Sequence, residues 1–538
     1  MFNQKRKLKE RLSASFGKLK DETFTFELIE RYFRNKDKTD AFQVLSDKTC
    51  NDLDFKELFM FADRTTSKVG QQYLYNAMRT IPADDDKLIT QEKLIDKISS
   101  NSDLRLSLQL QLDKLVKDDT YYITSLFQDE HVKEPKWFFI IPLLSFTSLL
   151  SLLLLSFNPQ LLFVLFGVFI INVGIHFGNK RNLYQYCGSI PQLLRLNGVA
   201  KEFLKNDLFN EINKDVPDSI AVIDKVRNRM SFFKLEARLE SDTEIAFWGM
   251  LEFLKIIFLL EPLLLFGVLK QLDTKRSEIE KVFSFVGYID SLISIASLRK
   301  GLDQFCLPEI NNKSKVLEAS AVYHPLIHNC VTNSIQVKDK SILLTGSNMS
   351  GKTSFIRTIG ISAITGLTIN TCFAERLSMP RIKVFSAIRI SDDLMNDKSY
   401  YFEEVLTIKE MISQSGSGKP NLFLLDEIFK GTNTVERISA GKAVLSFLAK
   451  ADNIVFVSTH DIELTDLLYD EYVLYHFSEK VDHKTVDFDY RLKEGKLKNR
   501  NAIRILQIND YPDEIIKEAI EISKELDKVI VAIKLYNT

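Results

Sequence analysis

The chain has 538 residues, a net charge of −1 and an apolar fraction of 45%. This length predicts about two to four domains with large cores, and the balanced charge argues against a general polyanion binder while leaving room for a local basic strip. The five cysteines form no C-x-x-C pair, which argues against a metal site or disulfide framework and for a reducing compartment. The charged amino terminus has no apolar signal-peptide core, so we expect the carboxy-terminal half not to be secreted.

The first part of the chain is predicted to be helical. Residues 1–45 are charged and predict a helical extension. Residues 46–300 carry apolar residues at spacings of three and four, such as Leu58 with Phe61, which is typical of packed helices. The charged runs between them are typical of solvated helix faces. We therefore expect a mostly α-helical core over residues 46–300.

A long segment without acidic or basic residues, 137–178, interrupts this core. It divides at Asn158-Pro159, and residues 137–157 and 160–177 each have the length of one bilayer crossing, about 20 residues. The flanks are basic at both ends: Lys133, Lys136, Lys180 and Arg181. Positive flanks predict that both ends face the cytoplasm. We expect a transmembrane helical hairpin in the cytoplasmic (inner) membrane, with a fully buried helical hairpin as the alternative.

A second apolar stretch, residues 246–269, is interrupted by Glu252, Lys255 and Glu261. Ionisable groups at the bilayer centre cost roughly 2.5–3.5 kcal/mol each on the insertion scale. Glu252 and Lys255 stand three residues apart and can pair on one helix face. The pattern favours a buried or interfacial core helix, with a further membrane span as the alternative.

From residue 301 onward, short β-rich runs alternate with helical segments. The clearest apolar runs are residues 341–345, 421–425 and 453–458. This alternation is typical of an α/β domain with a largely parallel sheet. We expect such a domain over residues 301–538, with a helical segment at its carboxy-terminal end.

The residues after the first of these strands fit the phosphate-loop pattern G-x-x-x-x-G-K-[ST]. They are Gly346, Ser347, Asn348, Met349, Ser350, Gly351, Lys352 and Thr353. The loop lies between a predicted strand and a helix that continues through Ser354, which is the context that the motif requires. Glycines let the backbone wrap phosphates, and N–H groups at a helix amino terminus favour anions. We therefore expect ATP here, with Lys352 on the β- and γ-phosphates and the Thr353 hydroxyl on Mg²⁺.

Two later strands end in polar residues. Residues 421–425 lead into Asp426 and Glu427, and residues 453–458 lead to His460. Downstream of a phosphate loop, Asp426 is expected to hold Mg²⁺ and Glu427 to polarise the attacking water. Taken alone, such carboxylates are also typical of helix caps, and a lone histidine is often structural. With Lys352, we expect Glu427 and His460 to be catalytic, the histidine sensing the γ-phosphate.

A short polar segment, Ser399-Tyr400-Tyr401-Phe402, lies between the phosphate loop and the acidic strand. Read by itself, it is a loop that enters an amphipathic helix, with Ser399 in the position of an N-cap.

Together these motifs resemble the MutS family of mismatch-repair ATPases. Residues 345–357 resemble the phosphate loop of that family, and residues 426–434 resemble its acidic motif and the G-T-x-T loop after it. Ser458-Thr459-His460 is similar to its switch histidine. Ser399 to Phe402 is similar to its S-x-F signature, with one extra tyrosine. The resemblance covers residues 301–515, including His324-Pro325-Leu326, and extends more weakly to the helical core, at Asp63-Arg64-Thr65 and at 289–292.

This resemblance implies a fold and an activity. The fold is an α/β P-loop ATPase domain, similar to that of ABC proteins, preceded by a MutS-like helical core that carries the hairpin. The activity is ATP hydrolysis with Mg²⁺ by a homodimer, in which Ser399 contacts nucleotide bound to the other subunit. DNA is implied as a ligand, bound weakly or non-specifically through its backbone. Because the core resemblance begins near residue 46, we expect no mismatch-reading domain.

Two other functions fit the same motifs. One is a membrane-tethered ATPase switch or scaffold without a DNA function. The other is transport, as in ABC proteins, although one hairpin offers few helices for a translocation path.

Overall fold

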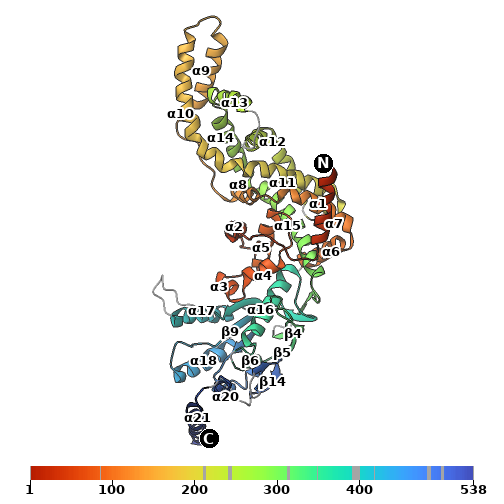
Figure 1. Ribbon diagram of the computed structural model, residues 1–538, viewed down its shortest axis with the longest axis vertical. Helices are drawn as coiled ribbons and strands as arrows, with labels where there is room; N and C mark the ends of the chain where they lie inside the picture. Colours follow the sequence, from red (N-terminus) through yellow and green to blue (C-terminus); the bar gives the residue numbers. More distant parts are fainter. Residues whose placement is uncertain are drawn as a thin grey trace. The chain divides into compact units, whose positions relative to one another are not determined.

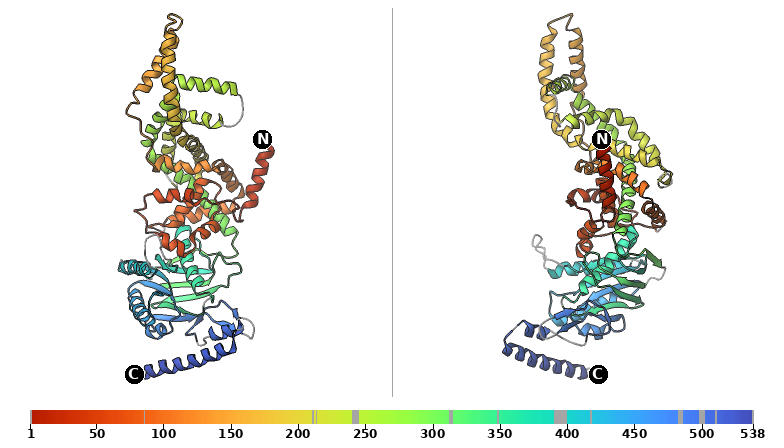
Figure 2. Two further views of the ribbon diagram at one scale, coloured as in Figure 1. Left: turned by 60° about the vertical axis from the view of Figure 1, so that its left-hand side comes forward. Right: turned by 45° about the vertical axis from the view of Figure 1, so that its right-hand side comes forward.

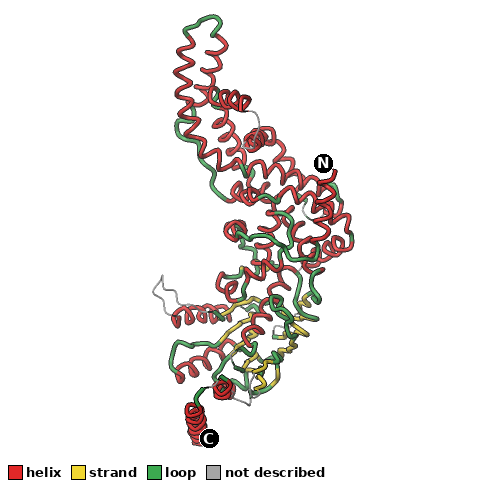
Figure 3. Tube along the Cα trace, viewed as in Figure 1, coloured by secondary structure: helices red, strands yellow, loops and turns green. Residues whose placement is uncertain are grey.

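The computed structural model divides into two compact units (Figure 1). It describes residues 2–84, 86–209, 212, 214–239, 245–311, 315–347, 349–389, 400–416, 418–481, 486–497, 502–509 and 511–536. The first unit comprises residues 1–39, 62–79 and 85–301, and the second comprises residues 40–61, 80–84 and 302–538. The strands gather mainly in the second unit, so the chain combines a helical part with an α/β part (Figure 3).

The first unit is helical. Its α-helices are α1 (Phe2–Ser15), α2 (Phe26–Asn35), α5 (Lys68–Arg79), α6 (Asp86–Ser100), α7 (Ser102–Leu112), α8 (Ser125–Gln128), α9 (Ile140–Leu154), α10 (Leu161–Cys187), α11 (Ser189–Leu204), α12 (Val216–Leu239), α13 (Ile245–Ile257), α14 (Leu260–Asp273) and α15 (Arg276–Lys300). Helix α15 packs against α5, α6, α11 and α12. It is apolar enough to cross a membrane, but 83% of its apolar window is buried, which makes it the core helix of this unit.

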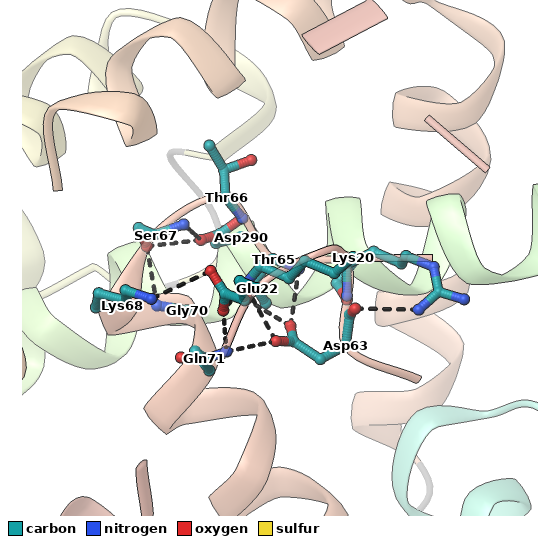
Figure 4. A network of polar contacts seen from close by, with 12 residues as sticks. Lys20, Glu22, Asp63, Thr65, Thr66, Ser67, Lys68, Gly70, Gln71 and Asp290 are labelled. Carbon is teal, nitrogen blue, oxygen red and sulfur yellow. Dashed lines mark hydrogen bonds and ion pairs between the residues drawn. The ribbon is translucent and has the colours of Figure 1, made fainter. Parts of the chain in front are cut away.

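A buried carboxylate joins α15 to the start of α5 (Figure 4). Asp290 accepts hydrogen bonds from the N–H groups of Thr66 (2.9 Å) and Ser67 (2.7 Å), and from the Ser67 hydroxyl (2.6 Å). The Ser67 hydroxyl in turn accepts the Gly70 N–H (2.9 Å) at the start of α5, as an N-cap does, so Asp290 holds the capping residue of α5 from another helix. Helix α5 passes so close that a Cβ added to Gly70 would lie 2.1 Å from Asp290 Oδ2.

A second buried carboxylate, Asp63, organises the loop before α5 (Figure 4). It accepts from the Lys20 ammonium (3.1 Å), the Thr65 N–H (2.9 Å) and the Gln71 amide (2.7 Å). Burial raises the pKa of Asp63, but Lys20 and these hydrogen bonds outweigh it and hold that pKa below its usual value. The weak sequence resemblance at residues 63–65 and 289–292 thus falls on a polar junction in the centre of the unit.

The apolar segment 137–178 forms a helical hairpin of α9 and α10, with Asn158-Pro159 in the turn (Figure 1). Most of its apolar side chains are exposed: Phe157 is 84% exposed and Phe163 is 80% exposed. Residues Leu161–Lys180 of α10 are long and apolar enough to cross a membrane, whereas α9 itself is shorter. The expected helical hairpin is therefore present, and the described part of the chain leaves most of its surface uncovered. That the hairpin crosses a bilayer stays a prediction.

The stretch 246–269 forms two helices, α13 and α14, rather than one. The break lies at Leu259, whose backbone is left-handed with φ of 47°. Glu252 and Lys255 pair as expected, with Lys255 Nζ 3.0 Å from Glu252 Oε2. Among the described residues, only α10 and α15 have the length and hydropathy of a span. The stretch therefore agrees with the favoured core or interfacial segment.

The second unit is built on a six-stranded sheet with the strand order β14-β11-β6-β10-β9-β8. The strands are β6 (Ser341–Thr345), β8 (Lys383–Ala387), β9 (Asn421–Asp426), β10 (Asn453–Ser458), β11 (Tyr472–His476) and β14 (Lys493–Glu494). All pairs are parallel except β11 with β14. The three expected strands are confirmed as β6, β9 and β10, and their buried runs are typical of a parallel sheet covered on both faces.

Further elements surround this sheet. A four-stranded sheet has the order β3-β7-β4-β5, from Pro308–Asn311, Arg376–Pro380, Val316–Val322 and Asn333–Lys338. Two short pairs are β1 (Gln43–Val44) with β2 (Thr80–Ile81) and β12 (Glu479–Val481) with β13 (Val486–Phe488). The helices are α3 (Asp47–Asp52), α4 (Phe55–Ala62), α16 (Lys352–Ile369), α17 (Tyr400–Ser415), α18 (Thr434–Leu448), α19 (Glu463–Leu467), α20 (Ala502–Ile508) and α21 (Asp513–Tyr536).

Residues 40–61, which we expected partly in the helical extension (up to residue 45) and partly in the helical core, pack with the second unit. The Gln43 side chain hydrogen bonds with Val384 of β8 through both its oxygen (2.8 Å) and its nitrogen (2.7 Å), as a neighbouring strand would. Buried Asp52 accepts from Ser386 Oγ (2.7 Å) and from the Ile388 N–H (3.0 Å). These contacts cover the edge strand of the sheet, which would otherwise expose unpaired backbone groups.

The junction at Asp290 yields a stability prediction. Gly70→Ala should lower the free energy of unfolding by about 1–3 kcal/mol, because its methyl group would overlap a carboxylate fixed by three hydrogen bonds. Gly198→Ala in α11 is the matched control, since an added Cβ there meets nothing within 4 Å. Thermal unfolding in detergent measures both. Equal melting temperatures for the two variants would contradict the close packing at Gly70.

Candidate nucleotide-binding site

The loop between β6 and α16 contains three residues with positive φ, a conformation that favours glycine. Gly346 has φ of 150° and Gly351 has φ of 104°, and Met349 between them has φ of 69°. A Cβ on Gly346 would lie 2.8 Å from the Phe477 carbonyl oxygen. Only glycine fits there, so the first glycine of the motif is required for packing as well as for conformation. Asn348 lies outside the described residues.

Lys352 begins α16, and its side chain folds back over the loop. The buried ammonium donates to the carbonyl oxygens of Gly346 and Ser347, both at 2.8 Å. Burial lowers the pKa of Lys352, and the carboxylates of Glu427 and Asp426 act in the opposite direction. The loop therefore encloses a positive charge beside the first N–H groups of a helix, a combination that attracts phosphate.

A hydroxyl and a carboxylate meet at the start of α16. Thr353 Oγ1 donates to Asp426 Oδ2 over 2.8 Å, and Ser458 Oγ is hydrogen bonded to Asp426 Oδ1. The register of the sheet explains this, because β9 and β10 pair in parallel with Ser458 opposite Asp426. Hydroxyl and carboxylate oxygens are the ligands that Mg²⁺ prefers. The two residues predicted to hold the metal therefore lie together and fit it chemically.

Glu427 follows Asp426 in a left-handed conformation, with φ of 52°. Its N–H donates to the Ser458 carbonyl at 2.9 Å. Its carboxylate contacts His460 Nε2 through Oε1 (2.8 Å) and the Lys430 ammonium through Oε2 (2.7 Å). Burial raises the pKa of Glu427, but the hydrogen bonds from His460 and Lys430 outweigh it and lower this pKa to about 2. The side chain is thus ionised and held in one place.

The three predicted catalytic side chains come together. His460 Nε2 lies 2.8 Å from Glu427 and 3.5 Å from Lys352 Nζ. The next residue, Asp461, accepts two hydrogen bonds from the Arg437 guanidinium, at 2.9 and 2.7 Å. These groups lie where the strands β6, β9 and β10 end, the edge at which parallel α/β sheets bind ligands.

A cavity of about 490 Å³ opens beside the loop. Lys352, Thr353 and Glu427 line it, as do Ser347, Met349, Ser350, Gly351 and Ser354 of the loop. The cavity is also lined by residues to which the sequence analysis gave no role in the site: His324, His328, Cys330 and Tyr490. The Ser350 hydroxyl is buried and finds no hydrogen-bond partner within the described part of the chain. The size and the mixed lining fit a small ligand with a phosphate at one end.

Two positioning residues were missed by the sequence analysis. Lys430 holds the Glu427 carboxylate, and Asn333 holds Tyr490 at the cavity by accepting from the Leu492 N–H (2.8 Å) and donating to the Tyr490 carbonyl (3.0 Å). Lys430 stands three residues after Glu427, but in a loop without a periodic pattern. Asn333 is more than 150 residues from its partner in sequence. No pattern in the neighbouring sequence predicts either contact.

Ser399 lies outside the described residues, and α17 begins at the next residue. The start of α17 packs on the loop after Glu427, because buried Glu404 accepts the Phe429 N–H. A Cβ on Gly431 would lie 2.9 Å from Tyr401 Cβ. Burial raises the pKa of Glu404, whereas the Phe429 N–H opposes that shift. The segment expected to contact a second subunit is therefore attached to the acidic loop.

Comparison with known proteins agrees with this geometry. Residues 342–527 match the family model of MutS domain V. The protein named DNA mismatch repair protein MutS of Aquifex pyrophilus is 28% identical over 270 residues, which cover 48% of this chain and 31% of that protein. The proteins of the same name from Petrotoga mobilis and Pseudothermotoga lettingae are each 29% identical, over 272 and 262 residues, covering 48% and 47% of this chain and 33% and 32% of theirs. The chain spans about a third of the length of these relatives.

His324 at the cavity yields a pH prediction. Burial, with a smaller contribution from Arg357, lowers its pKa to about 4, below the value of about 6.5 in an unfolded chain. Between these values the unfolded state binds a proton that the folded state does not, so stability falls as pH falls from about 6.5 to about 4. His324→Asn, whose oxygen can accept the Leu326 N–H in place of Nδ1, should weaken this dependence. Melting temperatures between neutral and mildly acidic pH measure it, and parallel curves for the two proteins would contradict the prediction.

Proposed function

Because it carries MutS domain V, this chain belongs to the MutS family, and we propose that it binds and hydrolyses ATP at the site described above. One observation carries the proposal. Two hydrogen-bonded pairs lie next to the glycine loop: Thr353 with Asp426, and Glu427 with His460. The Lys352 ammonium donates to the backbone of the same loop. A phosphate-binding loop, a metal-binding oxygen pair and an oriented base are the parts that phosphoryl transfer to water requires.

The chain's residues would hold MgATP in distinct ways. Residues 346–354 would surround the phosphates with backbone N–H groups, and Lys352 would neutralise the outer two. Thr353 and Asp426 would hold Mg²⁺. Bound MgATP supplies the phosphoanhydride bond that is cleaved. The buried, otherwise unbonded Ser350 hydroxyl and the cradle at Gly346, which a Cβ would fill, support this fit.

Glu427 would act as the base that orients water. It is ionised at neutral pH, since its pKa lies at about 2, and it can therefore accept a hydrogen bond from water without first losing a proton. His460 and Lys430 keep the carboxylate in place. Such positioned acid–base groups contribute about 10²–10⁴-fold to rates. His460 also lies near Lys352, which suits a group that responds to the outermost phosphate.

We further propose that the protein acts as a homodimer, with Ser399 of each subunit reaching the nucleotide of the other. The attachment of α17 to the acidic loop through Glu404 supports this, because movement at the dimer contact would reach Glu427 directly. Duplex DNA is the proposed ligand, since the relatives that match are named as DNA mismatch repair proteins. With a balanced net charge, binding would be weak or non-specific and sensitive to salt.

The α9–α10 hairpin is the proposed membrane anchor. Its exposed aromatic and aliphatic side chains form a continuous apolar surface of a kind that soluble proteins rarely leave uncovered. The basic flanks at Lys136 and Lys180 support an orientation with the ATPase unit on the cytoplasmic side of the inner membrane. This exposed hairpin also favours a second candidate function, a membrane-tethered ATPase switch or scaffold that needs no DNA.

Glu427→Gln tests the proposed chemistry. The amide keeps the size of the side chain but cannot accept a proton from water, so hydrolysis should fall by about 100-fold or more while ATP binding persists. The trapped nucleotide should shift the protein towards a closed dimer. ATP turnover and nucleotide binding, with sedimentation for the dimer, measure these effects in detergent.

Two variants frame this result. Lys352→Ala should lose nucleotide binding itself, because it removes the charge that closes the loop. Glu518→Gln, on the exposed face of α21, is a matched charge-to-amide control and should turn over ATP normally. Normal turnover by Glu427→Gln would show that Glu427 is not the base. Normal ATP binding by Lys352→Ala would contradict the proposed nucleotide site.

A further inference from the structure

Helix α13 is an amphipathic helix with its polarity reversed. On the outward face, Met250 and Phe253 are 59% and 52% exposed, and Leu254 is exposed beside them. On the opposite face, Lys255 is only 3% exposed and Glu252 is mostly covered. A helix on a water-soluble protein turns its charged side chains outward. This arrangement is the one expected of a helix surrounded by lipid.

The inward charges form a compensated cluster with α10 and α14. Glu252 contacts His176 Nε2 at 3.0 Å and Lys255 Nζ at 3.0 Å, and it also contacts the Lys180 ammonium. Glu261, fully buried, contacts Lys255 Nζ at 3.2 Å and His176 Nδ1 at 3.4 Å. The three groups His176, Glu252 and Glu261 stand close enough to hold a metal ion, but two ammonium groups already neutralise both carboxylates. The cluster therefore fastens α13 and α14 to α10.

The break between α13 and α14 is also closed by the hairpin. A helix that ends leaves its last carbonyl groups without intrahelical partners. Here the Ile257 carbonyl accepts from Asn172 Nδ2 of α10 and the Phe258 carbonyl accepts from Ser145 Oγ of α9, both at 2.8 Å. Asn172 is itself buried. Within a bilayer, irregular backbone is tolerated only where protein satisfies it in this way.

The position of α13 along α10 sets its depth. Counted from Leu161 at 1.5 Å per residue, Asn172 lies about 17 Å and Lys180 about 28 Å along the helix. With the hairpin turn at the far surface of a hydrocarbon layer of about 30 Å, both levels fall in the half nearer the cytoplasm. Helix α13 crosses the hairpin rather than running along it (Figure 1, Figure 2). The Phe253 ring reaches towards the midplane and packs on Phe169 of α10, at about 12 Å along that helix, with centroids 5.4 Å apart, so the outward face of α13 continues that of the hairpin.

We propose that α13 is embedded in the cytoplasmic leaflet, lying across the hairpin with Met250, Phe253 and Leu254 against lipid acyl chains. The charged cluster and the two carbonyl caps hold it there. The inference rests on the proposed membrane anchor and adds a lipid-contacting element that is not a span.

Tryptophan reporters test the depth of α13. The chain has two tryptophans, Trp137 and Trp248, and both are replaced by phenylalanine. Single tryptophans are then placed by Met250→Trp in α13, by Ile170→Trp in the hairpin and by Tyr469→Trp at an exposed position of the second unit. Each full-length protein is reconstituted into phosphatidylcholine vesicles that carry a nitroxide either near the headgroup end or near the methyl end of the acyl chain.

The reporters separate the two proposals. The tryptophan of Met250→Trp should be quenched more strongly by the nitroxide near the headgroup (shallow) than by the nitroxide near the methyl end (deep). Ile170→Trp, about 14 Å along α10, should respond more to the deep nitroxide, and Tyr469→Trp to neither. Quenching at Ile170→Trp without any at Met250→Trp would overturn the placement of α13 and leave the anchor standing. Absence of quenching at both positions would overturn the anchor and the inference with it.

Discussion

The Asp426 carboxylate is the point on which the proposed nucleotide site depends. It stands at the end of a buried strand and accepts hydrogen bonds from Thr353, at the start of α16, and from Ser458, at the end of the neighbouring strand. The parallel register of β9 and β10 makes this geometry unavoidable once the strands are paired. With the end of β9 fixed, Glu427 turns into a left-handed conformation and meets His460. The glycine loop, the proposed metal ligands and the proposed base are therefore positioned by one sheet edge.

Short sequence patterns predicted much of this site and of the elements that carry it. The three central strands, the glycine loop, the acidic pair and the histidine all lie within short stretches whose spacing reflects a strand followed by a turn. The helical hairpin was equally clear, because an uncharged segment with one Asn-Pro break has few other structures. The register that joins Asp426 to Ser458 is not local, but it follows from the parallel sheet that the alternating elements predict.

Contacts between distant residues could not be predicted. Asn333 behind Tyr490 and Gln43 on the edge of β8 depend on where distant segments meet in space. The assignment of residues 40–61 to the second unit has the same cause. Lys430 is only three residues from Glu427, but it lies in a loop without a periodic pattern. The break within the stretch 246–269 was not predicted, because its composition averages over two helices and only the left-handed Leu259 reveals where one ends.

The first unit solves a different problem, that of burying charge. In its centre, the carboxylates of Asp290 and Asp63 accept hydrogen bonds from donors around the start of α5, such as the Ser67 N–H and the Gln71 amide. Near the hairpin, charges turn inward and apolar side chains turn outward. The same physics applies in both places, since a buried charge persists only where it is paired and hydrogen bonded. The difference lies in the surroundings, which are protein for the first junction and, in the proposed account, lipid for the second.

The most direct test of the central claim is ATP turnover by the full chain in floated vesicles, with and without duplex DNA, at low and moderate salt. The account predicts that the protein floats with the vesicles, hydrolyses ATP there, and is stimulated by DNA in a salt-sensitive manner. Hydrolysis without a DNA response would favour the membrane switch over the DNA-dependent function. Protein that stays at the bottom of the gradient, or floats without hydrolysing ATP, would contradict a membrane-held MutS-type ATPase.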